Sequence, residues 1–277
     1  MKKMLIVGAK GMLGGALCER FHGDEIVAWD REHDITDQEH ITKAIRDVHP
    51  DLVINAAAWN DVDGAEDHWE NAMRVNGTAP GILADCCESL AIPFVHVSTS
   101  WVFNGETQHG FHEEDPRAPL SSYARSKAQG EEEVERRCSR YYIVRGDRLY
   151  GSGVTKNIVD TFFKLGSRGE ELRVVNDQWG SSVWTRDLAV AMESLIRDQA
   201  PFGIYHLVNE GSATWYDLAC AIRDMARLSC TITPVDHTVY PRKAPVPRNS
   251  TILNTKRPPL RDWKEALQEY LRAAYHV

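Results

Sequence analysis

Short apolar runs alternate with longer amphipathic segments through the first half of this 277-residue chain, and no other feature constrains its fold as strongly. The apolar runs cover residues 4–7, 26–29, 52–55, 94–98 and 142–145. The segments between them, at 12–22, 38–48, 70–90 and 122–138, carry apolar residues at helical spacing. Alternating strands and helices form parallel sheets that are covered on both faces. The pattern therefore predicts an α/β fold with a doubly wound, Rossmann-like parallel sheet.

After residue 150 the alternation becomes irregular, which predicts a second, smaller α/β domain at the C-terminus. Helices are expected near 156–166, 185–197, 214–227 and 262–274, and short strands near 172–175, 204–208 and 231–234. Five prolines between residues 241 and 259 mark a segment that is neither helix nor central strand. We expect one domain to comprise residues 1–151 and 177–207, and the other residues 152–176 and 208–277.

Composition restricts the classes of partner. The net charge of −8 argues against non-specific nucleic-acid binding, and no stretch reaches the roughly 18 apolar residues of a membrane span. The six cysteines lack metal-site spacing, so a cytoplasmic location is the simplest interpretation. Asp61, Asp63 and Glu66 could suggest a metal site, but without ligand histidines the pattern favours capping of the next helix.

The sequence VGAKGMLGG places Gly8, Gly11 and Gly14 where the first apolar run meets the first predicted helix. Such a turn lets backbone amides and a positive helix N-terminus approach a pyrophosphate. The second run ends at Asp30, whose carboxylate would accept the ribose hydroxyls of a dinucleotide. Arg31 follows, and because a carboxylate repels a 2′-phosphate that a guanidinium attracts, NADH and NADPH both stay open. The first domain is therefore expected to bind the dinucleotide, and the second to bind substrate.

Tyr123 and Lys127 lie four residues apart in a predicted helix, so their side chains share one face. We expect the ammonium to lower the pKa of the phenol, which suits a proton donor to a developing alkoxide. An exposed tyrosine beside a solvated lysine is the usual meaning of this spacing. The dinucleotide fingerprint earlier in the chain favours the catalytic interpretation.

Two further groups have structural interpretations. His96 alternates inside an apolar run and is expected to be a buried histidine with hydrogen-bond partners. The acidic run Glu131 to Glu133, followed by Arg136 and Arg137, is expected to form a solvated helix face with ion pairs one turn apart.

Several sequence blocks occur together and in order. They are the glycine turn, NAAAWNDVDGAE (55–66), VNGT (75–78), STSWVFNG (98–105), the Tyr-x-x-x-Lys pair, VNDQWGSS (175–182) and YHLVNEGSATWYDLACAI (205–222). Together they resemble the extended short-chain dehydrogenase/reductases, and among these the dTDP-4-dehydrorhamnose reductase (RmlD-like) family. The resemblance implies an oxidoreductase of deoxysugar and polysaccharide biosynthesis. Such an enzyme uses NADPH or NADH to reduce the 4-keto group of a nucleotide-diphosphate 6-deoxy-4-keto-hexose.

The resemblance also implies roles for individual residues. The family's catalytic threonine precedes the tyrosine by 24 positions, which is Thr99 here; it would hold the substrate carbonyl while Tyr123 gives the proton. The implied cofactor residues are Gly8, Lys10, Gly11, Met12, Leu13, Gly14, Asp30, Arg31, Asp34, Ile35, Ala56, Ala57, Ala58, Tyr123 and Lys127. The implied substrate residues are Trp59, Val62, Thr99, Ser100, Trp101, Arg148, Trp184 and Arg248.

Departures from the family pattern gather around the expected sugar. Where the family usually reads Ser-Thr-Asp-Tyr, this chain has Ser100 and Trp101, so a hydroxyl replaces a carboxylate. Where the family usually reads Arg-Thr-Ser-Trp, this chain has Asp147 and Arg148, so a guanidinium replaces an indole. These changes alter the expected substrate contacts and leave the expected chemistry intact.

The departures leave open which groups pair with Arg148 and which cations would bind the substrate diphosphate. We expect Arg148 to meet Asp147, Glu113 or Glu114, or else a polar or anionic substituent of the sugar, because an unpaired buried charge is costly. An outward-facing Arg148 in a local ion pair is the alternative. The arginine of the family's Arg-Pro pair falls on Val246, although three cations remain near enough to pair with a diphosphate: Arg242, Lys243 and Arg248.

Other function classes stay open beside the reductase. The regulatory β subunit of methionine adenosyltransferase resembles the same subfamily, so a non-catalytic NADP-binding subunit is one alternative. A sugar-nucleotide epimerase or dehydratase of the superfamily is another; those enzymes recycle the cofactor internally. The sugar, the nucleotide base, the choice between NADH and NADPH, and the choice between monomer and homodimer are left open.

Overall fold

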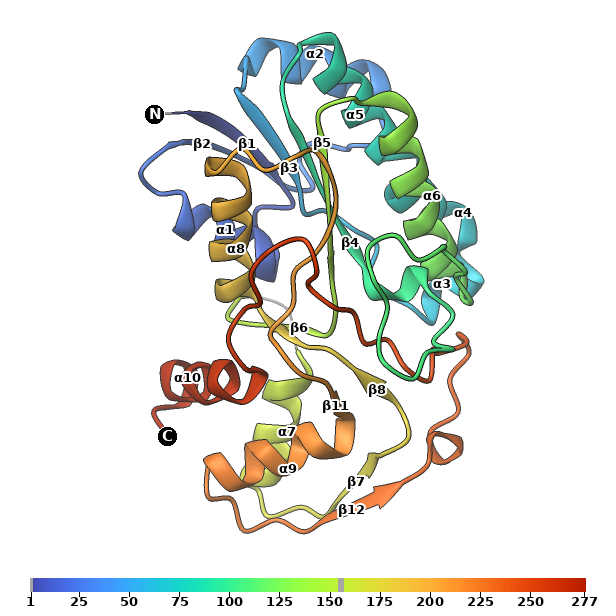
Figure 1. The fold of residues 1–277 in the computed structure, drawn as a ribbon, viewed down its shortest axis with the longest axis vertical. Coiled ribbons are helices and arrows are strands. Elements are labelled where there is room, and N and C mark those ends of the chain that lie inside the picture. Colours follow the sequence, from blue (N-terminus) through green and yellow to red (C-terminus); the bar gives the residue numbers. More distant parts are fainter. Residues whose placement is uncertain (1, 154–156) are drawn as a thin grey trace.

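The computed structural model describes residues 2–153 and 157–277, and a six-stranded parallel sheet forms its centre (Figure 1). The strand order is β10 (Gly203–His206), β5 (Tyr141–Gly146), β4 (Phe94–Thr99), β3 (Leu52–Asn55), β1 (Lys3–Val7) and β2 (Glu25–Trp29). Because β2 and β3 lie on opposite sides of β1, the chain changes direction there and leaves a crevice at the carboxyl edge of the sheet. The predicted doubly wound sheet is confirmed.

Helices cover both faces of this sheet. One face carries α1 (Met12–Arg20) and α8 (Thr185–Arg197), and the other carries α2 (Gln38–Val48), α5 (Ala79–Ser89) and α6 (Ser122–Arg137) (Figure 1). Successive side chains of a strand point to opposite faces. In β1, Met4 and Ile6 accordingly join the core beneath α1 and α8, whereas Leu5 and Val7 join the core beneath α2 and α5.

The helix expected over residues 70–90 is interrupted. The structure has α3 (Gly64–Asp67), α4 (Trp69–Ala72) and a π-helical turn, η1 (Met73–Thr78), before α5 begins. In η1 the Asn76 side chain accepts from the Trp59 amide (2.8 Å) and donates to the Trp59 carbonyl (3.0 Å). Gly130 lets α6 lie close to η1, because a Cβ there would overlap the Asn76 carbonyl oxygen. The spacing of apolar residues could not predict this π-helical turn, because the turn is associated with the hydrogen bonds of one polar side chain, Asn76.

The remaining elements form a smaller group in the lower half of Figure 1. Its helices are α7 (Ile158–Ser167), α9 (Trp215–Met225) and α10 (Trp263–Tyr275), packed around Tyr150, Trp184 and Tyr270. Short strands pair as β7 (Leu172–Val175) with β12 (Ile232–Val235), β8 (Trp179–Gly180) with β11 (Ala213–Thr214), and β6 (Leu149–Tyr150) with β9 (Val183–Trp184).

The expected domain boundaries stay a prediction. Segment 177–207 supplies α8 and β10 to the large sheet, and it also supplies β8 and β9 to the smaller group. Residues 154–156, which include the expected start of a helix at 156, lie outside the described residues. Within the described part of the chain, no helix is long and apolar enough to cross a membrane.

The glycine turn between β1 and α1 depends on missing side chains. Gly8 has a φ of +79°, and its amide and that of Ala9 both donate to the Trp29 carbonyl of β2 at 2.9 Å. A Cβ on Gly8 would lie 2.6 Å from the Ala57 nitrogen, and a Cβ on Gly14 would overlap the Gly8 carbonyl oxygen. The turn therefore brings β1, β2 and the segment after β3 into contact at the carboxyl edge.

We predict that Gly8→Ala destabilises the protein by about 2 kcal/mol or more, because alanine is strained at positive φ and the methyl group overlaps Ala57. Thermal unfolding of the variant measures this loss. Gly15→Ala is the matched control: Gly15 lies in α1, and the nearest atom to its added Cβ is 4.0 Å away. An equal loss of stability in both variants would contradict the role given to the Gly8 turn.

Candidate active site

Thr99, Tyr123 and Lys127 meet where β4 ends against the first turns of α6. Thr99 is the last residue of β4, and its hydroxyl accepts from the Trp101 amide at 3.3 Å. Tyr123 is 8% exposed, and the Thr99 hydroxyl beside it favours the phenolate. Lys127 is 2% exposed, and its Nζ donates to the carbonyl of Val97 in β4 at 2.8 Å. The three predicted residues thus line one corner of the crevice.

Two caps fix where α6 begins. The Ser121 hydroxyl accepts from the Ala124 amide at 3.1 Å, as expected of an N-cap serine. The Glu66 carboxylate of α3 also accepts from both the amide and the hydroxyl of Ser122, at 2.7 Å each. Glu66 therefore caps a helix as predicted, but the helix is α6. This contact ties the segment after β3 to the helix that carries Tyr123 and Lys127.

Burial controls the charge of both residues on α6. It raises the pKa of Tyr123 to about 12, an effect larger than the opposing one of Thr99. Burial lowers the pKa of Lys127 to about 8, against the opposing charge of Glu131. The expectation of a lowered pKa for Tyr123 is therefore wrong for this structure, because desolvation of the phenolate outweighs the contacts that favour it. A neutral phenol at pH 7 is the proton-donating form.

The cofactor residues lie along the adjoining strand ends. Asp30, just beyond β2, accepts from the amides of Lys10 (3.0 Å) and Arg31 (2.9 Å), and the Lys10 ammonium pairs with Glu32 at 3.1 Å. Asp34 accepts from the Thr36 amide at 2.9 Å. The neighbouring Ile35 is 6% exposed and packs in the core beneath α2 and α5, so its side chain is committed to packing.

A second set of contacts joins these strand ends to β4. Asn55, the last residue of β3, accepts from the Ala57 amide at 3.1 Å, and its Nδ2 lies 3.3 Å from Nδ1 of His96. Burial keeps the pKa of His96 well below its usual value. Its Nε2 has no hydrogen-bond partner among the described residues, so the expectation of a fully bonded histidine is wrong. Neutral His96 fits the buried position, because a neutral ring avoids adding a charge beside Lys127.

Three of the predicted substrate residues surround Tyr123. Trp59, Val62 and Trp101 pack against it in one apolar cluster. The Trp101 ring meets the Tyr123 ring edge-on, with 6.2 Å between centroids. An apolar wall beside the phenol excludes water and offers aromatic faces to a sugar or base.

The departures Ser100 and Asp147 lie together. Ser100 is fully buried just after β4, and Asp147 is 2% exposed just after the neighbouring β5. The Ser250 hydroxyl donates to Asp147 at 2.8 Å. Burial raises the pKa of Asp147 to about 6, although Arg148 and the two serine hydroxyls oppose this. A buried carboxyl group thus lies next to the end of β4, because Thr99 pairs with Gly146, the residue before Asp147.

Arg148 has partners that the sequence did not indicate. Its guanidinium donates to the carbonyls of Ala213 (2.8 Å) and Gln178 (3.0 Å) and lies 3.9 Å above the Trp215 ring. Glu113 instead bonds Thr255, and Glu114 pairs with Lys256. Both an outward-facing Arg148 and an Arg148 paired with these glutamates are therefore wrong. Main-chain dipoles and an aromatic face stabilise the charge here, with Asp147 adding to them electrostatically.

The remaining predicted substrate residues separate from one another. Trp184 is 5% exposed in the core around Tyr150 and Tyr270, so packing explains its presence. Arg248 pairs with Asp177 at 3.1 Å. The two other cations proposed for a diphosphate also pair with carboxylates, Arg242 with Asp63 at 2.9 Å and Lys243 with Asp67.

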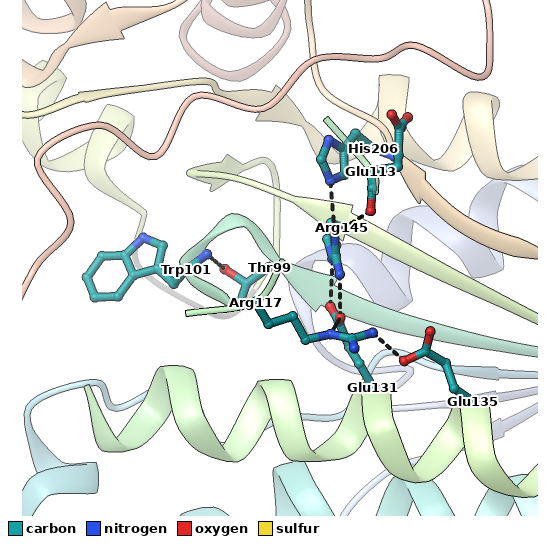
Figure 2. A network of polar contacts seen from close by, with 8 residues as sticks. All are labelled: Thr99, Trp101, Glu113, Arg117, Glu131, Glu135, Arg145 and His206. Atoms are coloured by element: carbon teal, nitrogen blue, oxygen red, sulfur yellow. Dashed lines mark hydrogen bonds and ion pairs between the residues drawn. The ribbon is translucent and has the colours of Figure 1, made fainter. Parts of the chain in front are cut away.

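Sequence reasoning missed the buried charges behind the site. Glu131, expected on a solvated face, is fully buried and forms a two-point ion pair with Arg145 of β5, at 2.9 and 2.7 Å (Figure 2). Arg117 contacts the same carboxylate from the loop before α6. The outer part of the acidic run behaves as expected, because Glu133 pairs with Arg136 and Arg137 on the surface. Arg145 inside an apolar run was the available signal, since a buried arginine requires an anion.

We predict that Arg148→Met lowers the free energy of unfolding by about 2 kcal/mol, because it leaves two main-chain carbonyls without their donors. Chemical denaturation measures the change. Arg186→Met is the control: Arg186 is 62% exposed at its side chain and also lies over a tryptophan ring, at 5.5 Å from Trp184. We expect little change there, and equal losses in the two variants would show that the carbonyl contacts of Arg148 contribute nothing.

The chain matches the family described as "RmlD substrate binding domain" over residues 1–276. It is 36% identical to the spore coat polysaccharide biosynthesis protein SpsK of Bacillus subtilis, over 98% of each chain. It is also 36% identical to dTDP-4-dehydrorhamnose reductase of Streptomyces griseus, over 96% of this chain and 92% of that one.

Solved structures agree with this similarity. The dTDP-4-dehydrorhamnose reductase of Clostridium acetobutylicum superimposes with a TM-score of 0.94 at 34% identity, over 98% of this chain and 99% of that one. The Bacillus anthracis enzyme, solved with NADP, gives a TM-score of 0.95 at 30% identity, over 99% of each chain. This chain therefore belongs to the RmlD substrate-binding domain family.

Proposed function

We propose that this protein is an NAD(P)H-dependent sugar-nucleotide 4-ketoreductase. Its substrate is dTDP-4-dehydrorhamnose or a closely related nucleotide-diphosphate 6-deoxy-4-keto-hexose. The observation that carries the proposal is the meeting of Thr99, Tyr123 and Lys127 at the end of β4, on the same carboxyl edge of the sheet as the glycine turn after β1. Relatives named dTDP-4-dehydrorhamnose reductase, and one named as a probable 4-ketoreductase of a dTDP-linked sugar in Streptomyces antibioticus, support it.

The residues present fit a dinucleotide. Glycine at positions 8 and 14 lets the turn pack closely against Ala57 and against α1, and this turn leads into the N-terminus of α1, where backbone amides would bind a pyrophosphate. Asp30 and Arg31 would hold the adenosine ribose, Ala56 to Ala58 would line the inner side, and Lys127 would bind the nicotinamide ribose. When bound, the nicotinamide supplies a hydride to the substrate carbonyl carbon.

The chain's own residues control the charge and the proton. The Thr99 hydroxyl holds the carbonyl oxygen, and Tyr123 donates its phenolic proton to that oxygen as negative charge develops. The raised pKa of about 12 keeps Tyr123 protonated before the reaction. The ammonium of Lys127, one helical turn away, then stabilises the phenolate that is left behind.

The altered residues bear on the choice of sugar. Trp59, Val62 and Trp101 form the apolar side of the proposed pocket. The buried carboxyl group of Asp147 would bound this pocket on the side of Ser100. Arg148 acts on substrate choice through the position of Trp215 and β11, because its guanidinium is committed to both. Arg248 would exchange its partner Asp177 for the substrate diphosphate.

We predict that Tyr123→Phe lowers kcat/KM for NADPH oxidation with dTDP-4-dehydrorhamnose by about 10²- to 10⁴-fold, because the proton donor is lost. Cofactor binding, followed by NADPH fluorescence, should persist. Tyr141→Phe is the matched control, since Tyr141 lies at the opposite end of β5 from the site and should be replaceable without loss.

The same assay separates the other function classes. A non-catalytic subunit would consume no NADPH with any keto-sugar nucleotide. An epimerase or dehydratase would convert substrate without net consumption of reduced cofactor, since the cofactor is regenerated in each cycle. Either outcome for the wild type across a panel of 4-keto sugar nucleotides would overturn the proposed reaction.

A further inference from the structure

The buried charges around Arg145 form a layer directly behind Lys127. Glu131 lies one helical turn after Lys127 on α6, so the two side chains share a face. The Arg145 guanidinium contacts the Glu131 carboxylate on one side and, on the other, the Glu113 carbonyl at 3.2 Å and His206 at 3.3 Å (Figure 2). The layer extends from Glu131 of α6 through Arg145 of β5 to His206 of β10.

The charges in this layer balance. Lys127 and Arg145 are the deeply buried cations, and Glu131 and Glu113 are the deeply buried anions. His206 adds no charge near neutral pH, because burial and the neighbouring Arg145 lower its pKa to about 4. Arg117, 20% exposed at its side chain, pairs with Glu131 and with Glu135 toward the surface. Removing one member of such a set leaves its partner uncompensated.

Lys127 depends on this layer for its counter-charge. Its hydrogen bond is to the Val97 carbonyl, which is a neutral dipole. Glu131 is the anion that opposes the effect of burial on Lys127. Arg145 and Arg117 hold Glu131 ionised, with its pKa at about 2. A fully charged carboxylate is therefore kept one turn behind a lysine that burial would otherwise neutralise.

We propose that Glu131 is a positioning residue for the reduction: it holds Lys127 in its charged form beneath Tyr123, and Arg145 limits how much of the Glu131 charge reaches Lys127. The idea rests on the proposed function, in which Lys127 must be cationic to stabilise the phenolate. Glu131 touches neither substrate nor cofactor and acts through Lys127.

Other charged groups around α6 are engaged elsewhere. Glu66 of α3 caps Ser122, Arg74 of η1 donates to Thr36, and Asp85 of α5 pairs with Arg137. On β4, His96 is neutral and therefore does not stabilise the charge of Lys127. The hydroxyl of Ser98, on the same strand, favours the ionised form of Glu131. Tyr123 is neutral. The carboxylate of Glu131 and the guanidinium of Arg145 are thus the buried charges that act electrostatically on Lys127.

The test measures the titration of Lys127 directly, in the full-length protein labelled with ¹³Cε-lysine, using Lys127→Arg to assign the signal. In Glu131→Gln we expect the titration midpoint of Lys127 to fall by about one pH unit or more. In Arg145→Met it should rise, because Glu131 then acts on Lys127 without competition. Glu135→Gln is the matched control, since Glu135 lies one turn further along α6 and pairs with Arg117 near the surface.

The single variants could fail to fold, because each leaves a buried charge without its partner. The double variant Glu131→Gln/Arg145→Met removes both buried charges together and keeps the test valid in that case. It too should show a lowered midpoint. In the turnover assay of Glu131→Gln, the fall of kcat/KM at high pH should move with the Lys127 midpoint. If that midpoint falls by one pH unit, kcat/KM should drop about tenfold at pH 8.5 and change little at pH 6. Opposite shifts for the two single variants are not expected of residues that only stabilise the fold.

An unchanged Lys127 midpoint in both Glu131→Gln and the double variant would overturn the inference, as would an equal shift in Glu135→Gln. The NMR titration does not depend on turnover. A wild-type protein that titrates as expected but never oxidises NADPH would therefore refute the proposed function alone.

Discussion

The ion pair between Arg145 of β5 and Glu131 of α6 determines how the helix that carries Tyr123 and Lys127 lies on the sheet. Both side chains are buried, and their two parallel hydrogen bonds allow little change in distance or angle. Breaking such a pair by removing one partner costs about 3–5 kcal/mol, because a charge is left buried without compensation. The position of α6 relative to β4 therefore follows from a charge requirement as well as from apolar packing.

The opposite side of the site depends on close backbone contact. Gly8 approaches Ala57 more closely than any side chain would allow, and Asn55 links the end of β3 to His96 of β4. Asn76 lies in the π-helical turn η1, where its side chain accepts from the Trp59 amide and donates to the Ser126 hydroxyl of α6 at 3.1 Å. The glycine turn and α6 are thus joined through one continuous set of strand ends, which keeps the proposed cofactor and proton-donor positions in register.

Much of the fold could be predicted from the sequence because the signal was repeated. The apolar runs and helical spacing gave the parallel sheet, and α8 (Thr185–Arg197) matches its expected range of 185–197. Local pattern failed where a distant partner decided the outcome. Glu131 looks like part of a solvated acidic run until Arg145 is placed opposite it, and the interruption at η1 depends on Trp59 and Gly130.

The same limit applied to the pocket. The Tyr-x-x-x-Lys spacing placed Tyr123 and Lys127 on one helix face, and the family resemblance together with the end of an apolar run pointed to Thr99; the structure brings the three side chains together at the end of β4. The partners of Arg148 are two main-chain carbonyls and an indole from segments 30 to 67 positions away. Because every residue has a carbonyl, the sequence does not indicate which carbonyls accept from Arg148. The pKa of Tyr123 was misjudged for a related reason, because burial of the phenol depends on Trp59, Val62 and Trp101 from other segments.

The central claim is that this chain directs a hydride from the cofactor to the carbonyl carbon of a keto-sugar nucleotide and leaves it there. The most direct measurement uses NADPH carrying deuterium at the transferable C4 position, with mass spectrometry and NMR of the sugar product. The claim predicts one deuterium at C4 of the sugar for each cofactor oxidised. A product without deuterium at C4, or recovery of the reduced cofactor after conversion of the sugar, would contradict it.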